Sequence, residues 1–426
     1  MVFCARMAAT CLVVVSWWSV AAPAAAQSCS GAIARANVAP CALSASLALL
    51  HARGGNEVLE ARRRAVSPLL PRNPELTFSA AHRSTPAQTS TNWYATLSQE
   101  LEIAGQRSAR QAQADAALQA QASTVVATER DVAALAFRAY FEALAAQEFL
   151  ATAQRLEQIF AQSSRATQAG AAQGLVSGID AEVADLNTLR LVQQRIDAER
   201  GAHTAHAALL TWLGRDPADP VVVQGALTPL AHASALQLSE LAARVESRPE
   251  VTRARHNLAL QHAARATLER SRVPNVTLSL IAQRDGFGEQ VFGGGIAVPV
   301  PLPYPLGRTL HGELSENAAL AKQFETELEQ LRRSLRLELL EAFYAHAAAQ
   351  QQAALYSEER VTQAQRSLED LAEALQGGRV PISEAVIAQQ TLVEFMRGQI
   401  RAKLELCSSS IELARSAGLS LWGDEL

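Results

Sequence analysis

The sequence predicts a mainly helical protein that carries two pairs of β-strands and was built by duplicating one unit. Long alanine-rich stretches without a helix breaker predict helices far longer than usual. Short stretches in which apolar and polar residues alternate predict strands. The same features then recur in the same order, at offsets between 200 and 204 residues. These three observations together predict a duplicated unit of helix, β-hairpin and long helical hairpin.

Composition excludes several classes of protein. The chain has 426 residues and a formal net charge of −4, so it lacks the basic excess of a nucleic-acid binder. Mean hydropathy is close to zero, which excludes a bundle of many membrane helices. Half of the residues are apolar, but alanine is the commonest of these and only 5% of the chain is aromatic. Such a composition makes a thin core and disfavours a compact two-domain enzyme.

Residues 1–26 are expected to be a secretory signal. Arg6 precedes an apolar stretch, and Ala24, Ala25 and Ala26 supply the small residues of a cleavage site. The alternative, a membrane anchor, is disfavoured because the apolar run is short and contains Pro23. No other apolar run approaches the ~20 residues of a membrane helix. If the exported chain enters a bilayer, it does so as strands.

Three cysteines remain after cleavage. Cys29 and Cys41 lie in the N-terminal segment, residues 27–42, and can close a short loop in an oxidising compartment. The alternative is a lipid anchor on Cys29, although the residues before it lack the usual apolar position. Cys407 lies in a helical stretch and is expected to be an unpaired packing residue.

The first repeat covers residues 43–231. A helix is expected over about 43–69, strands over about 76–83 and 93–103, and a long helical hairpin over about 106–213. The second strand illustrates the alternation. One face takes Trp93, Ala95, Leu97, Leu101 and Ile103, and the other takes Tyr94, Thr96, Ser98, Glu100 and Glu102.

The second repeat covers residues 232–426. A helix is expected over 234–272 with an interruption near Pro249, and strands over about 275–284 and 291–302. Pro299 and Pro301 mark the place where the last strand must leave the sheet. A long helical hairpin over about 308–417 completes the repeat.

Four strands are too few to close a barrel, and open strand edges cannot face lipid. Two chains would give eight strands with a filled interior, whereas three would give twelve strands and room for a lumen. The alternative is a soluble sheet packed against helices, because both arrangements share the alternation. The long helices also need neighbours, since a lone alanine-rich hairpin has a thin core. Both requirements favour an oligomeric tube.

Five short segments lie in a characteristic order along the chain. They are 73–76 (Asn-Pro-Glu-Leu), 101–107 (Leu-Glu-Ile-Ala-Gly-Gln-Arg), 174–180 (Gly-Leu-Val-Ser-Gly-Ile-Asp), 248–251 (Arg-Pro-Glu-Val) and 298–302 (Val-Pro-Val-Pro-Leu). No single motif is specific, but the order and duplication of the motifs are. In these segments the sequence resembles the outer-membrane factor (TolC-type) family, and the resemblance covers nearly all of the chain after the signal.

The resemblance implies a homotrimer with a twelve-stranded barrel in the outer membrane of a Gram-negative bacterium. A helical tunnel would extend into the periplasm and dock onto a periplasmic adaptor and an inner-membrane resistance-nodulation-division pump. The barrel would contact outer-membrane lipid, and the duct would export small solutes passively. Segments 73–76 and 101–107 look like the heavy-metal cation branch.

The turns of the two helical hairpins would form the periplasmic tip. Gly174 and Gly378 permit the chain to reverse. Six residues after each comes a carboxylate, Asp180 and Glu384, and the resemblance implies that these acids line the pore constriction. Three copies of each would form acidic rings that favour cations. The alternative is that both acids simply compensate a helix macrodipole.

Apolar residues at the same turns suit contact with the adaptor. They are Leu175, Val176, Val380 and Ile382. Packing between neighbouring turns is the alternative. Arg379 is expected either to pair with Asp180 or Glu384, or to be solvated.

We expect no enzyme, no cofactor and no metal site. His203 and His206 lie three residues apart, but a third ligand is missing nearby. No Ser-His-Asp arrangement or phosphate-binding glycine loop is found in the sequence. The alternative function is a periplasmic adaptor or coiled-coil assembly protein, which would carry one helical hairpin rather than two.

Overall fold

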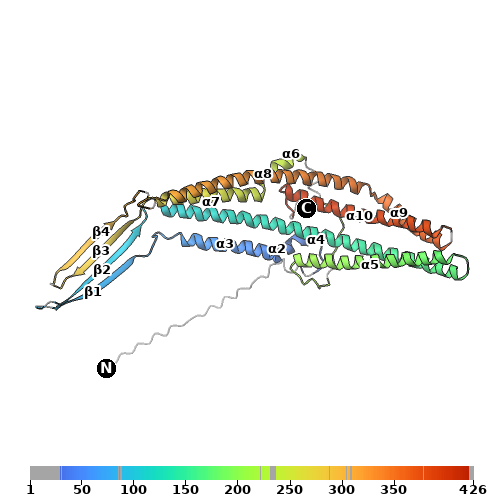
Figure 1. Cartoon of the computed structure of the whole chain (residues 1–426), viewed down its shortest axis with the longest axis horizontal. Helices are drawn as coiled ribbons and strands as arrows, with labels where there is room; N and C mark the ends of the chain where they lie inside the picture. The colour runs from blue at the N-terminus through green and yellow to red at the C-terminus, as the bar shows by residue number, and fades with distance from the viewer. Residues whose placement is uncertain are drawn as a thin grey trace, which may run out of the picture.

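The computed structural model describes residues 29, 31–84, 86, 89–220, 222–230, 237–286, 288–303, 305–307, 309–377 and 379–421. The expected signal segment, 1–26, lies outside this set. The described chain is elongated, with a β-sheet at one end and the two helical turns at the other (Figure 1). Helices run along the whole distance between them.

The sheet has four antiparallel strands in the order β1-β2-β3-β4. They are β1 (Glu75–Ser84), β2 (Thr89–Leu101), β3 (Val276–Arg284) and β4 (Gln290–Ala297). The last strand ends at Ala297 and not at 302 as expected, because Pro299 and Pro301 have no N–H for the ladder.

The register places the apolar faces of all four strands on one side of the sheet. Phe78, Ala95, Ala282 and Phe292 are cross-strand partners in one row. The opposite face is more polar. Besides Ile281 and Val291 it carries hydroxyl, amide and glycine positions, namely Thr77, Ser79, Tyr94, Thr96, Ser98, Thr277, Ser279, Gln283, Gly293 and Gly295. The apolar face has no cover within one chain, and Phe292 is 76% exposed.

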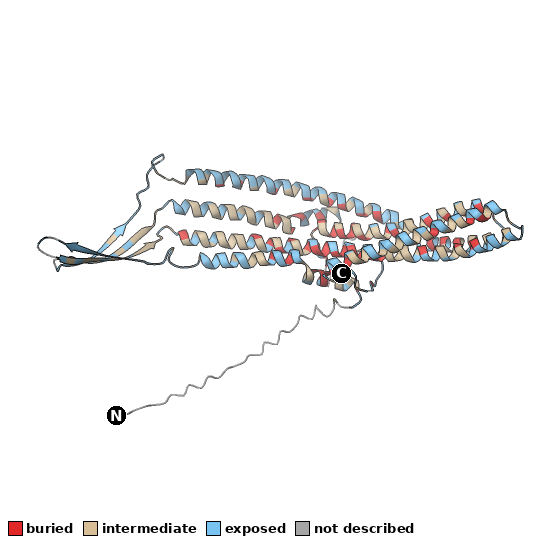
Figure 2. Cartoon of the chain, turned by 60° about the horizontal axis from the view of Figure 1, so that its bottom comes forward, coloured by how far each residue is buried: buried red, intermediate tan, exposed pale blue. Residues whose placement is uncertain are grey.

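Next to the sheet, four helices lie side by side in a single layer (Figure 2). In spatial order they are α3 (Leu47–Ala65), α4 (Gln106–Ala172), α7 (Pro249–Ser271) and α8 (His311–Ala354). Each contacts the next, so α3 and α8 form the two edges of the layer. The helix expected over about 43–69 is divided in the structure. α2 (Arg35–Ala45) ends before Ser46, and Ser46 caps the start of α3.

The other half of the molecule contains the two helical hairpins. α5 (Gly178–Trp212) returns along α4, and α10 (Ile382–Ser416) returns along α9 (Glu358–Gln376). α4 is one continuous helix of 67 residues, about 100 Å long at ~1.5 Å per residue.

The first arm of the second hairpin, which is expected over about 308–417, is not one continuous helix, because it is broken at residues 355–357. The Ser357 hydroxyl caps α9 by accepting a bond from the Arg360 backbone N–H, 3.4 Å away. At the break, the Tyr356 ring packs 5.0 Å from the Phe395 ring and against Gly398, which has no side chain to obstruct it.

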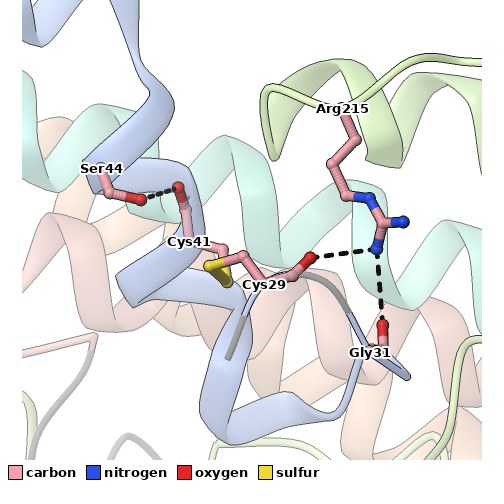
Figure 3. Close-up of a disulfide and its surroundings, with 5 residues drawn as sticks. All are labelled: Cys29, Gly31, Cys41, Ser44 and Arg215. Carbon is pink, nitrogen blue, oxygen red and sulfur yellow. Dashed lines mark hydrogen bonds between the residues drawn. A yellow bond between two sulfur atoms is a disulfide. The ribbon is translucent and has the colours of Figure 1, made fainter. Parts of the chain in front are cut away.

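The N-terminal segment is attached to the middle of the molecule. Cys29 and Cys41 form a disulfide, and the Arg215 guanidinium donates to the carbonyl oxygens of Cys29 at 3.0 Å and Gly31 at 3.4 Å (Figure 3). A sulfur in a disulfide is not free for acylation, so this arrangement agrees with the expected disulfide rather than with the lipid anchor. Cys407 is buried and free.

Charged groups are buried where the helices of the two halves meet. Arg248, immediately before α7, is only 1% exposed. Its guanidinium contacts Glu250 at 2.9 Å and Glu338 of α8 at 3.4 Å, and it donates to the Ser416 carbonyl at the end of α10 at 3.0 Å. Arg130 of α4 donates to the Arg415 carbonyl at 2.8 Å. This buried ion-pair cluster therefore joins four helices.

Replacing Arg248 with alanine should destabilise the chain strongly, because Glu250 and Glu338 would lose their buried partner. Removing one member of a buried ion pair costs about 3–5 kcal/mol. We expect a clear fall in the thermal unfolding midpoint measured by circular dichroism in detergent. The control is Arg333→Ala, which removes an exposed arginine from α8. Equal midpoints for the two variants would contradict this role of Arg248.

Candidate functional site at the helical tip

Both helical hairpins reverse through the same backbone motif. The Leu175 N–H bonds to the Gly170 carbonyl at 2.9 Å, and the Arg379 N–H bonds to the Ala374 carbonyl at 2.9 Å. These equivalent bonds close the ends of α4 and α9. Gly174 has a φ of +74°, a conformation that favours glycine. Gly378, the glycine expected at the second turn, lies outside the described residues.

Each returning helix carries the expected acid in its first turn. Asp180 is half-buried near the start of α5, where the Ser177 hydroxyl caps the helix by accepting from the Ile179 N–H at 3.2 Å. Glu384 is exposed in the first turn of α10. Neither carboxylate forms an ion pair within the part of the chain that the structure describes, so both remain free to act on an ion or a partner.

A cavity of about 980 Å³ separates the two turns. Six of the expected tip residues line it, namely Leu175, Val176, Asp180, Arg379, Val380 and Ile382. Gly174 and Glu384 are not among its lining residues. The fold thus brings residues about 200 positions apart in sequence to one place.

Two expectations at the tip need correction. Arg379 pairs with Glu373 at 3.3 Å, rather than with Asp180 or Glu384, because the tight turn returns its side chain along α9. Ile382 is only 6% exposed, since the first residue of α10 faces the interior between the turns. Leu175 is exposed as expected, and Val176 and Val380 are half-buried.

The sequence reasoning missed an exposed apolar stripe on α5. Its members are Ile179, Val183 and Leu186, and Ile179 is 77% exposed. Their spacing of four and three residues puts them on one helix face, a signal that was visible in the sequence. Ile387, exposed on α10, occupies the position of the second repeat that corresponds to Val183. We call Ile179, Val183, Leu186 and Ile387 the tip stripe.

Polar bonds and a small apolar cluster join the two hairpins near the tip. Asn187 of α5 donates to Gln389 of α10 at 2.7 Å, and Arg397 of α10 donates to Gln194 of α5 at 2.9 Å. The apolar cluster consists of Leu156, Phe160, Leu191, Leu368, Val393 and Met396. The tip is therefore packed much more thinly than the middle of the molecule.

Among the described residues, no three or more histidine, cysteine or acidic side chains gather where they could hold a metal ion. His203 and His206 thus have no third ligand there. The same part of the chain has no helix both long and apolar enough to cross a membrane.

Comparison with known proteins shows what the chain is similar to. The family model described as "Outer membrane efflux protein" matches residues 42–215, which include β1, β2 and the first helical hairpin. The solved structure of the outer-membrane channel OprN has the same fold, with a TM-score of 0.75. The family match is therefore confined to residues 42–215, while the likeness to OprN shows a shared fold over 91% of the chain.

Individual relatives are distant in sequence. The OprN match is 18% identical and covers 91% of this chain and 90% of OprN. The outer membrane protein VceC from Vibrio cholerae has a TM-score of 0.72 at 16% identity, covering 91% of this chain and 96% of VceC.

A curated relative is the cobalt-zinc-cadmium resistance protein CzcC of Cupriavidus metallidurans, 28% identical over 232 residues. This match spans about half the length of each protein.

Substituting Gly174 with alanine should loosen the first turn, because a left-handed residue with a Cβ costs about 1–2 kcal/mol. Backbone amide exchange at Leu175, whose N–H closes the turn, should become several-fold faster. Gly178→Ala is the matched control, since Gly178 is helical and no atom lies within 4 Å of the added Cβ. Protection of Leu175 that stays unchanged in Gly174→Ala would contradict this role.

Proposed function

We propose that three copies of this chain form the outer-membrane exit duct of a tripartite efflux system, through which small solutes pass passively from a pump to the exterior. One observation carries the proposal: sheet and helix layer are both one element thick and both end in uncovered edges. β1 and α3 form one edge, and β4 and α8 form the other. Copies that join edge to edge would complete both layers at once.

The sheet suits closure by identical copies. β1 runs away from the helices and β4 runs back toward them (Figure 1), so β4 of one copy meets β1 of the next in antiparallel orientation. Unpaired backbone groups cost several kcal/mol each in lipid, and closure removes them. The apolar face would contact outer-membrane lipid, and the face with hydroxyls and glycines would line a lumen of twelve strands.

The helix edges support the same assembly. Along α3, apolar or small residues recur every three or four positions, at Leu47, Leu50, Gly54, Val58, Ala61 and Ala65; Gly54 is half-buried and the others are exposed. α8, on the opposite edge, exposes Leu337, Leu340 and Tyr344 on one face. A contact between two different edges is head-to-tail, and it forms a ring when the rotation closes.

The tip supports docking of a periplasmic adaptor, which would connect the duct to a resistance-nodulation-division pump. The tip stripe is exposed, and Asp180 and Glu182 lie to either side of it on α5. A helix with an apolar face and basic flanks would complement this surface.

For the cargo we propose heavy-metal cations. The relative in Cupriavidus metallidurans is named for resistance to cobalt, zinc and cadmium. Three copies each of Asp180 and Glu384 would give a tip that attracts cations electrostatically. The described residues form no metal cluster, which suits a duct that passes ions without retaining them.

Conductance in planar bilayers tests the duct directly. The wild-type protein should form cation-preferring channels, and the double variant Asp180→Ala, Glu384→Ala should lose several-fold in the cation-to-anion permeability ratio. Glu57→Ala, which removes an exposed acid from α3, is the control. Absence of channels in the wild type would contradict the duct, whereas unchanged selectivity in the double variant would contradict only the acidic rings.

The edges are tested separately by oligomeric state. Leu50→Glu on α3 and Leu340→Glu on α8 should each convert the trimer to a monomer, because both place a charge in a contact of apolar side chains. Light scattering coupled to size-exclusion chromatography in detergent measures the mass. The control Leu175→Glu introduces the same charge at an exposed tip residue. Edge variants that remain trimeric would refute the contact between α3 and α8.

A further inference from the structure

A rigid loop exposes two leucines at the base of the sheet. The loop, residues 67–72, joins α3 to β1 and has the sequence Ser-Pro-Leu-Leu-Pro-Arg. Leu69 is 76% exposed, and Leu70 is exposed as well. We call this segment the boundary loop.

Hydrogen bonds fix the boundary loop at the level where β2 becomes α4. The Arg107 Nε donates to the carbonyl oxygens of Ser67 and Pro68 at 3.0 Å each. The Gln99 amide donates to the Arg72 carbonyl at 3.0 Å. Because the loop is bonded at both ends and contains two prolines, its leucines are held in the exposed position. Ile103, at the same level of the chain, is exposed too.

Three exposed arginines near the boundary loop have no carboxylate partner among the described residues. Arg62 and Arg64 in the last turn of α3, and Arg272 just after α7, are exposed and form no ion pair among the described residues. We call these three the boundary arginines. Three nearby acids are already occupied, since Asp115 pairs with Arg63, Glu102 with Arg110 and Glu269 with Arg265. Glu60, four residues before Arg64 on α3, is exposed and forms no ion pair among the described residues. Glu75, the first residue of β1, is the exposed acid next to the loop.

The order of chemistry along the chain matches the depth profile of one membrane leaflet. The arginines of α3 come first and the leucines of the loop follow; after the exposed segment 72–75 (Arg-Asn-Pro-Glu), the apolar face of β1 begins at Leu76. Guanidinium groups bind phosphate through paired hydrogen bonds, while leucines enter the acyl layer. Long arginine side chains can also extend toward headgroups.

We propose that the boundary loop and the boundary arginines form a binding site for the phosphate headgroups of anionic phospholipids in the periplasmic leaflet. This rests on the proposed function, because the sheet must lie in the membrane. The site would fix how deeply the duct sits in the bilayer, with the leucines in the acyl layer and the arginines at the phosphates.

Thermal unfolding of the full-length protein in neutral detergent tests the site. Phosphatidylglycerol should raise the midpoint of the wild type, because a ligand that binds the native state stabilises it. Phosphatidylcholine and inorganic phosphate should raise it much less. High salt should reduce the effect of phosphatidylglycerol, since the contact is electrostatic.

Three variants locate the effect. Arg62→Gln with Arg64→Gln should lower the apparent affinity for phosphatidylglycerol by about 25-fold, at roughly fivefold for each arginine. Leu69→Ser with Leu70→Ser should weaken binding of both lipids. The control, Arg366→Gln with Arg401→Gln, removes two exposed arginines from the tip half and should behave as wild type.

Several outcomes would overturn the site. One is an equal response of the wild type to both lipids, and another is an equal response to phosphatidylglycerol and inorganic phosphate. A third is unaltered affinity in the Arg62, Arg64 variant. Loss of the trimer in that variant without added lipid would assign the arginines to contact with a second copy instead. Wild-type conductance is measured independently, so failure of the duct and failure of the lipid site are distinguishable.

Discussion

A layer one element thick cannot bury its own edges, and this constraint governs the whole molecule. The sheet has two unpaired strands at its margins, and the helix layer beside it ends in α3 and α8. Alanine-rich helices approach each other closely but bury little area per residue, so a single chain makes a thin wall.

Because the wall is thin, the chain concentrates its stability at mid-length. The apolar core there includes Phe137, Tyr140 and Phe141 of α4, and the buried ion-pair cluster joins α4, α7, α8 and α10. Burial alone would raise the pKa of Glu250, but its hydrogen bonds and the charge of Arg248 outweigh that effect and leave the pKa below its ordinary value of 4.5. The stabilisation from such a carboxylate is complete above its ordinary pKa and is lost as the pH falls through the lowered value.

Much of this fold could be predicted from the sequence. Strand alternation shows within a few residues, and the duplication shows in the order of elements along the chain. The features that escaped prediction depend on tertiary contacts. Residues 355–357 contain no proline or glycine, so the break before α9 depends on the Ser357 cap and on the packing of Tyr356 against Phe395 and Gly398. Likewise, the choice of Glu373 as partner of Arg379 follows from the geometry of a turn. The tip stripe, by contrast, was readable from spacing alone.

The Cys29–Cys41 disulfide depends on the compartment in which the chain folds. Such links form in oxidising compartments and are rare in the reducing cytoplasm. A copy retained in the cytoplasm would therefore lack this disulfide, and only noncovalent contacts would hold α2 to the residues before it. The covalent state of these two sulfurs thus records whether a given molecule has ever left the cytoplasm.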